Sequence, residues 1–202
     1  MTILVTAFEP FGGDSVNASL AAMEALEPEI RVGQKTVQVR KTILPVTFGG
    51  CGQALEQAMA EAEPDIVLCL GMAAGRGQIT PEVFAVNARY ARSADNAGQT
   101  YPVLTPCNTA GPAAYRTGLP AETIVQRLRE AGIPAELSFT AGTYVCNDLF
   151  YHLMTVSAVP AGFIHVPQAA EDAPEGRAAL AQAEISRGIA LAVAVLAEMP
   201  AG

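Results

Sequence analysis

Asp65-Ile66-Val67-Leu68-Cys69-Leu70 is a nearly continuous apolar run in the middle of the chain. A strand with one solvated face alternates apolar and polar residues, whereas a strand covered on both faces does not. The run therefore predicts a buried strand between two helical layers. The glycine-rich segment Gly71-Met72-Ala73-Ala74-Gly75-Arg76-Gly77 follows at once and is expected to leave the strand as a loop.

Strand and helix patterns alternate on both sides of this run. Further strands are expected at 3–7, 37–44, 82–88, 135–139 and 163–166. Helices are expected at about 17–26, 53–62, 121–131, 147–156 and 178–198. Residues 92–120 contain many turn formers and little periodicity, and a long irregular excursion of this kind is usually functional. The alternation predicts an α/β fold in three layers, α/β/α, with a mostly parallel central sheet of the phosphorylase- or hydrolase-like kind.

Length and composition predict one domain over residues 1–202, because no linker or charge run divides the chain. The formal net charge of −8, with Lys and Arg scattered, disfavours nucleic acid and anionic membranes as partners. The apolar N-terminal run stops at Glu9-Pro10 and resembles a first strand more than a signal peptide. The run 189–197 is too short to span a bilayer, so a soluble, cytoplasmic protein is expected.

The four cysteines are widely spaced and form no Cys-x-x-Cys pair. Without a secretion signal, this spacing favours free thiols over disulfides or zinc ligands. The chain has only two histidines, which argues against a metal site. Small solutes or proteins remain as partners.

A cysteine and a histidine lie at positions suited to nucleophilic catalysis. Cys146 follows an extended segment that ends at Tyr144-Val145 and precedes a helical apolar stripe, where unpaired backbone amides favour a thiolate. His165 lies in an apolar strand near the expected carboxyl edge of the sheet, where ligands bind in open α/β folds. Each also has a structural explanation, a buried small hydrophobe for Cys146 and a paired core imidazole for His165. His152 competes as a base but points away from the helix start.

The remaining motifs are weaker. Cys51, Cys69 and Cys107 lack a nearby helix start and histidine, so a structural role is favoured for them. A carboxylate is needed to orient the imidazole, and Glu82 is one candidate at the same sheet edge. A solvent-facing glutamate at a strand start is the competing interpretation. The glycine-rich segment lacks the spacing of a phosphate-binding loop.

Several motifs in one order resemble the pyroglutamyl peptidase type I (pyrrolidone-carboxylate peptidase) family of cysteine peptidases over nearly the whole chain. They are Val5-Thr6-Ala7-Phe8-Glu9-Pro10-Phe11-Gly12-Gly13, Leu44-Pro45-Val46, Gly71 to Asn87 with Ile79-Thr80-Pro81-Glu82, Asp95-Asn96, Gly111-Pro112-Ala113-Ala114-Tyr115, and the segments around Cys146 and His165. The family's triad falls on Cys146 as nucleophile, His165 as base and then acid, and Glu82 as the residue that orients His165.

The resemblance implies removal of an N-terminal pyroglutamate from peptides through a thioester, with no cofactor and no metal. Phe8 and Phe11 match an aromatic pair that sandwiches the lactam ring. Further substrate-binding candidates are Met72, Tyr144, Val145 and Arg92. The oxyanion is expected to bind backbone N–H groups of Cys146 and of the Gly71-Met72 loop. A homodimer or homotetramer is also implied.

The chain departs from the family pattern at two positions, Val83 where arginine is usual and Tyr90 where aspartate is common. These departures affect a local ion pair and the packing or subunit contact that it supports. Two other functions stay open: a non-hydrolytic ligand-binding or transferase protein on a phosphorylase-like scaffold, and a glutamine amidase that uses the same three residues.

Overall fold

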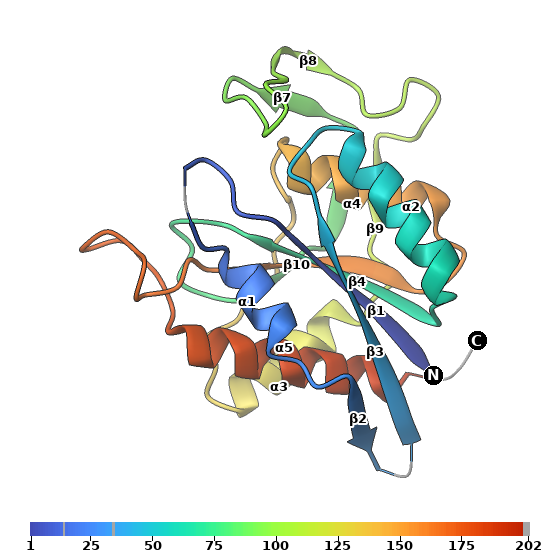
Figure 1. The fold of residues 1–202 in the computed structure, drawn as a ribbon, viewed down its shortest axis with the longest axis vertical. Coiled ribbons are helices and arrows are strands. Elements are labelled where there is room, and N and C mark those ends of the chain that lie inside the picture. Colours follow the sequence, from blue (N-terminus) through green and yellow to red (C-terminus); the bar gives the residue numbers. More distant parts are fainter. Residues whose placement is uncertain (14, 34, 200–202) are drawn as a thin grey trace.

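The computed structural model describes residues 1–13, 15–33 and 35–199. Its main sheet has the strand order β2-β3-β1-β4-β10-β5 (Figure 1). Four strands pair in parallel, β1 (Thr2–Phe8), β3 (Lys35–Leu44), β4 (Ile66–Met72) and β10 (Ala161–Val166). The edge strands β2 (Glu29–Val32) and β5 (Thr80–Pro81) are antiparallel to their neighbours. The predicted mostly parallel sheet is confirmed.

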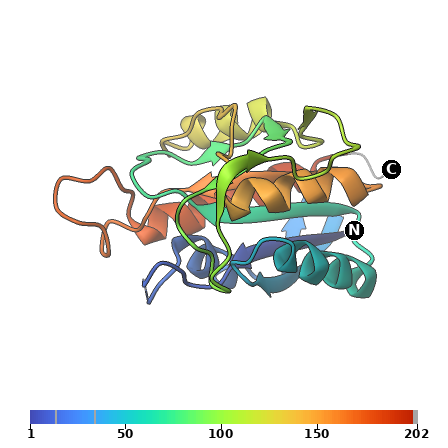
Figure 2. The same ribbon diagram turned by 90° about the horizontal axis from the view of Figure 1, so that it is seen from above.

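Helices cover both faces of this sheet, as Figure 1 and the view from above in Figure 2 show. On one face lie α1 (Ala18–Glu24), α3 (Ala121–Glu130) and α5 (Gln182–Ala197). On the other lie α2 (Gly50–Ala62) and α4 (Val145–Val156). The three-layer α/β/α arrangement predicted from the sequence is therefore present.

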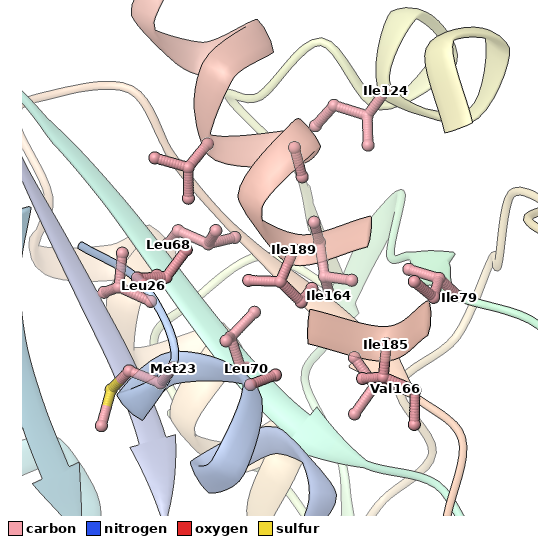
Figure 3. Close-up of a cluster of buried hydrophobic side chains, with 14 of the residues drawn as sticks. Met23, Leu26, Leu68, Leu70, Ile79, Ile124, Ile164, Val166, Ile185 and Ile189 are labelled. Carbon is pink, nitrogen blue, oxygen red and sulfur yellow. The ribbon is translucent and has the colours of Figure 1, made fainter. Parts of the chain in front are cut away.

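Strand β4 is apolar throughout because both of its faces are covered. Leu68 and Leu70 pack in the cluster under α1 and α5 (Figure 3), whereas Val67 and Cys69 pack in the cluster under α2 and α4. All seven residues of the strand are buried. Each buried aliphatic side chain of this kind contributes about 1.5–3 kcal/mol to stability.

Three expected elements differ from the structure. Of the expected strand 82–88, only β6 (Phe84–Val86) forms, because Glu82 makes an isolated bridge and the backbone N–H of Val83 bonds the carbonyl of Ser138. The expected strand 135–139 is wrong, since this segment forms only isolated bridges. The expected irregular excursion contains β8 (Tyr101–Thr105) and β9 (Ala114–Arg116), which pair with β7 (Arg89–Ala91) and β6 in two small sheets.

Helix boundaries decide where the functional candidates lie. Asn17 caps α1 as the sequence predicts, and its side chain accepts a hydrogen bond from the Ser19 N–H at 3.0 Å. Helix α4 begins two residues earlier than expected, so Cys146 lies inside its first turn. In the described part of the chain, none of the helices combines the length and the apolarity that a membrane crossing requires.

Candidate active site

Side chains along strand β10 alternate between the two faces of the sheet, and this alternation directs His165 toward helix α4. Ile164 and Val166 belong to the cluster on the α1 and α5 face, and Phe163 belongs to the cluster on the α4 face. Because side chains two residues apart share a face, His165 lies on the same side as Phe163. The two rings are in contact, with centroids 4.8 Å apart. The imidazole is therefore buried beneath the helix that carries Cys146.

Glu82 reaches the same face from the other side of β10. Its backbone N–H donates to the Phe163 carbonyl at 2.9 Å, directly after β5, which pairs Thr80 with His165. The Glu82 side chain is fully buried, and its Oε1 lies 2.7 Å from His165 Nδ1. A solvent-facing glutamate at this position is therefore wrong. The contact leaves Nε2 as the ring nitrogen free to exchange a proton with a reacting group.

Cys146 approaches this imidazole–carboxylate pair from the first turn of α4. Its Sγ lies 3.1 Å from the point that a Cβ on Gly71 would occupy, and Gly71 is the residue opposite His165 on β4. A side chain at residue 71 would also meet the Phe163 ring at 2.8 Å. Glycine thus makes room for the sulfur beside the histidine. Among the described residues, no hydrogen bond joins the thiol to the imidazole; in many enzymes such contacts are long until a substrate binds.

The electrostatics of the three groups fit a resting thiol and a neutral base. Burial and then the charge of Glu82 raise the pKa of the Cys146 thiol to about 12, although Arg76 lowers it. Burial lowers the pKa of His165 below its ordinary value, and the opposing effect of Glu82 is smaller. Burial raises the pKa of Glu82, but hydrogen bonds from His165 and Arg76 outweigh it and the net shift is downward. Glu82 is therefore ionised while His165 is neutral.

A small apolar pocket of about 10 Å³ lies beside the sulfur. Five of the sequence-predicted binding residues line it together with Cys146, namely Phe8, Phe11, Met72, Tyr144 and Val145. The sixth, Arg92, is exposed and lies in a neighbouring open cleft that shares Phe11 and Tyr144 with the pocket. The structure thus gathers the apolar candidates around the thiol and places Arg92 outside their pocket.

Sequence reasoning missed three residues at this site. Asn17 and Val46 line the pocket, and Arg76 donates a hydrogen bond to Glu82 Oε1 at 2.7 Å. Asn17 gave only a helix-capping signal, and its amide is occupied by Ser19 and by the Glu9 carbonyl. Val46 and Arg76 lie within motifs that resemble the family, but local periodicity gave neither of them a role, because their positions depend on pairing between distant segments.

The two departures from the family pattern lie on either side of the site. Val83 is buried at 5 % exposure, beside a backbone contact to Ser138. Tyr90 is 41 % exposed, and its backbone bonds Thr143 in both directions, just before Cys146 in the chain.

The relative reactivity of the four cysteines tests whether His165 activates the Cys146 thiol. All four are free thiols, and burial raises the pKa of Cys107 to about 11, below the value for Cys146. Acidity alone would therefore make the half-buried Cys107 react before Cys146. We expect iodoacetamide at neutral pH to label Cys146 first, because His165 accepts its proton. Peptide mapping by mass spectrometry checks the order, and His165→Ala should reverse it. Preferential labelling of Cys107 in the unaltered protein would contradict the expectation.

An α/β chain that places a cysteine in the first turn of a helix, beside a buried imidazole–carboxylate pair, has the arrangement of a cysteine hydrolase. Residues 1–199 match the family model described as pyroglutamyl peptidase. The chain belongs to this family.

Known relatives agree over nearly the full length. The pyrrolidone-carboxylate peptidase of Bacillus cereus is 40 % identical over 201 residues, covering 96 % of this chain and 92 % of the relative. That of Streptomyces coelicolor is 42 % identical over 205 residues, covering 98 % and 93 %. The crystal structure of pyroglutamyl peptidase I from Bacillus amyloliquefaciens superposes with a TM-score of 0.92 at 39 % identity, covering 98 % of this chain and 97 % of that one.

Proposed function

We propose that this protein is a cysteine exopeptidase that removes an N-terminal pyroglutamyl residue from peptides. The observation that carries the proposal is the buried Glu82–His165 pair, which lies beside Cys146 and an apolar pocket. The match of residues 1–199 to the family model supports it. A pyroglutamyl group is a small neutral lactam, so it suits a pocket walled by Phe8 and Phe11. A ligand-binding or transferase role has no comparable support.

The reaction follows from the three side chains in named roles. His165 Nε2 takes the proton of Cys146, and Sγ attacks the carbonyl that links the lactam to the next residue. His165 then gives this proton to the leaving amine as the C–N bond breaks, which leaves a thioester on Cys146. Water, deprotonated by His165, hydrolyses the thioester and releases pyroglutamate and the free thiol. Glu82 stabilises the imidazolium that forms in both steps.

Backbone amides are proposed to hold the oxyanion of each tetrahedral intermediate. The first N–H groups of a helix have no partner within the helix, so the N–H of Cys146 is available in the first turn of α4. A second donor is proposed from the Gly71-Met72 segment, which lies beside the sulfur. Such donors contribute about 2.7–4 kcal/mol each to transition-state stabilisation.

Substrate comparison tests the proposed function directly. Pyroglutamyl amide should be cleaved at least about 10²-fold faster than prolyl amide, because proline lacks the ring carbonyl of the lactam. An amide of uncyclised glutamate should also be rejected, since its charges would enter an uncharged pocket. Release of the amine is measured for each amide, and release of ammonia is measured for free glutamine. Preference for glutamine would support the amidase alternative, and cleavage of none would support a binding protein.

Other properties are proposed from the same observations. We propose that residues 1–202 form one pyroglutamyl-peptidase-like domain, which is supported by the family match over residues 1–199 and by one sheet that both core clusters share. A cytoplasmic location is proposed because all four cysteines are free thiols, as in reducing compartments. Peptides are the proposed partners; the net charge of −8 does not suit nucleic acid or anionic membranes.

A homodimer or homotetramer is proposed from the exposed β7–β8 hairpin, which projects beyond α2 and α4 (Figure 1). Val103 and Leu104 on β8 are 72 % and 68 % exposed, an unusual level for two adjacent aliphatic residues. A second copy of the chain is the proposed partner of this surface. Val103→Glu with Leu104→Lys is expected to reduce the sedimenting mass to that of a monomer. Val156→Glu, at an exposed valine at the end of α4, is the control. An unchanged mass would assign the contact to another surface.

A further inference from the structure

Arg76 is fixed against the catalytic carboxylate by several contacts. Its Nη1 donates to Glu82 Oε1 at 2.7 Å and to Thr80 Oγ1 at 2.5 Å, and its Nη2 donates to the Thr140 carbonyl at 3.3 Å. The Thr80 hydroxyl in turn donates to the backbone carbonyl of His165 at 3.3 Å. The guanidinium is thus tied to the segments that carry both members of the Glu82–His165 pair.

Arg76 is the permanent positive charge in contact with the Glu82 carboxylate. Its Oε1 accepts from both Arg76 and His165 at 2.7 Å, while its buried Oε2 has no hydrogen-bond partner among the described residues. A buried carboxylate that has only a neutral imidazole as partner is poorly compensated for its lost hydration. Arg76 supplies the charge, and because its side chain is 30 % exposed, the guanidinium itself keeps part of its hydration.

We infer that Arg76 is a positioning residue of the catalytic centre, which keeps Glu82 ionised and limits the pull of Glu82 on the proton of His165. The inference rests on the proposed function and assigns no contact between Arg76 and substrate. Arg76 does not line the apolar pocket, so its effect is exerted through Glu82. Without Arg76, Glu82 would draw the proton of His165 more strongly, so a larger share of His165 would be imidazolium at a given pH and could not accept the Cys146 proton.

The sign of the pH effect follows from the groups around the pair. The titratable and charged groups that act on it are Arg76 on the loop after β4 and Cys146 on α4. Arg76 lowers the pKa of Glu82 and of His165, so its removal raises both. Activity requires Glu82 ionised and His165 neutral. Both changes therefore move the acidic limb of the kcat/KM profile to higher pH.

Two substitutions at Arg76 separate charge from shape. Arg76→Met is expected to move the acidic limb upward by about one pH unit and to lower the plateau of kcat/KM for pyroglutamyl amide about tenfold, mainly through kcat. Arg76→Lys keeps the charge and should restore part of the shift. Arg127→Met is the matched control, because Arg127 also pairs with a glutamate, Glu198, but both are exposed and distant from the site. The control should leave the profile unchanged.

The rate of Cys146 alkylation is followed against pH in the same variants, so the inference is tested without substrate turnover. If the unaltered protein cleaves no pyroglutamyl amide, the proposed function fails, and the alkylation profile still decides the role of Arg76. Unchanged pH profiles in Arg76→Met would overturn the inference. If that variant does not fold, Thr80→Val, which removes one anchor of the guanidinium, should give a smaller shift in the same direction, and no shift would overturn the inference as well.

Discussion

Cys146→Ala is expected to abolish cleavage of pyroglutamyl amide, with a loss in kcat of at least about 10⁴-fold, while the fold survives. The loss follows because no other described side chain at the pocket can form the thioester. Among the described residues, the half-buried Cys146 side chain forms no hydrogen bond to another side chain, so its removal should change the thermal midpoint little. Initial rates and circular-dichroism melts of the same preparation provide the two measurements.

Cys107→Ala is the matched control, because Cys107 is also half-buried but lies by the β6 backbone, where its thiol contacts the Val86 carbonyl. It should retain nearly full activity. More than about one per cent residual activity in Cys146→Ala would show that this thiol is not the nucleophile.

Glu82→Gln is expected to lower kcat by about 10³-fold with a small change in KM, because Glu82 does not line the pocket. The amide can still accept a hydrogen bond from His165, but it carries no charge to stabilise the imidazolium formed during proton transfer. Glu82 raises the pKa of His165, so the neutral amide lowers that pKa further. The acidic limb of kcat/KM should therefore move to lower pH, opposite to the shift expected for Arg76→Met.

The pH profiles of both variants, measured with the same amide, check this pair of opposite shifts. Glu122→Gln is the control, since Glu122 pairs with Arg116 on the surface and both are exposed. A Glu82→Gln variant with unaltered kcat would remove the carboxylate from the mechanism.

The sequence predicts the layered fold because its signals are local. The apolar run 66–70 and the alternation of helices and strands depend on near neighbours in the chain, and the structure has those elements within a few residues of the expected positions. Segments 135–139 and 92–120 were predicted wrongly or incompletely, because their order comes from bridges and small two-stranded sheets formed with distant residues.

The site divides in the same way. Cys146 and His165 could be found from short motifs, since a helix start and a strand end are both visible in the sequence. Local patterns could only list Glu82 among several carboxylates, and the family resemblance was needed to select it, because its contact with His165, 83 residues away in sequence, depends on the pairing of β5 with β10. Arg76 depends on the same pairing. The hydrophobic periodicity of the sequence cannot predict that Arg76, in a loop, contacts the buried Glu82.

The most direct test of the central claim is to trap the intermediate. Pyroglutamyl amide is mixed with the protein, the reaction is quenched with acid within the first turnover, and the peptides are mapped by mass spectrometry. The account predicts a pyroglutamyl thioester on the peptide that contains Cys146, and none in Cys146→Ala. Two results would contradict it. The amide could be hydrolysed with the acyl group attached to another residue, or it could be hydrolysed with no covalent intermediate although a thioester is stable to the acid quench.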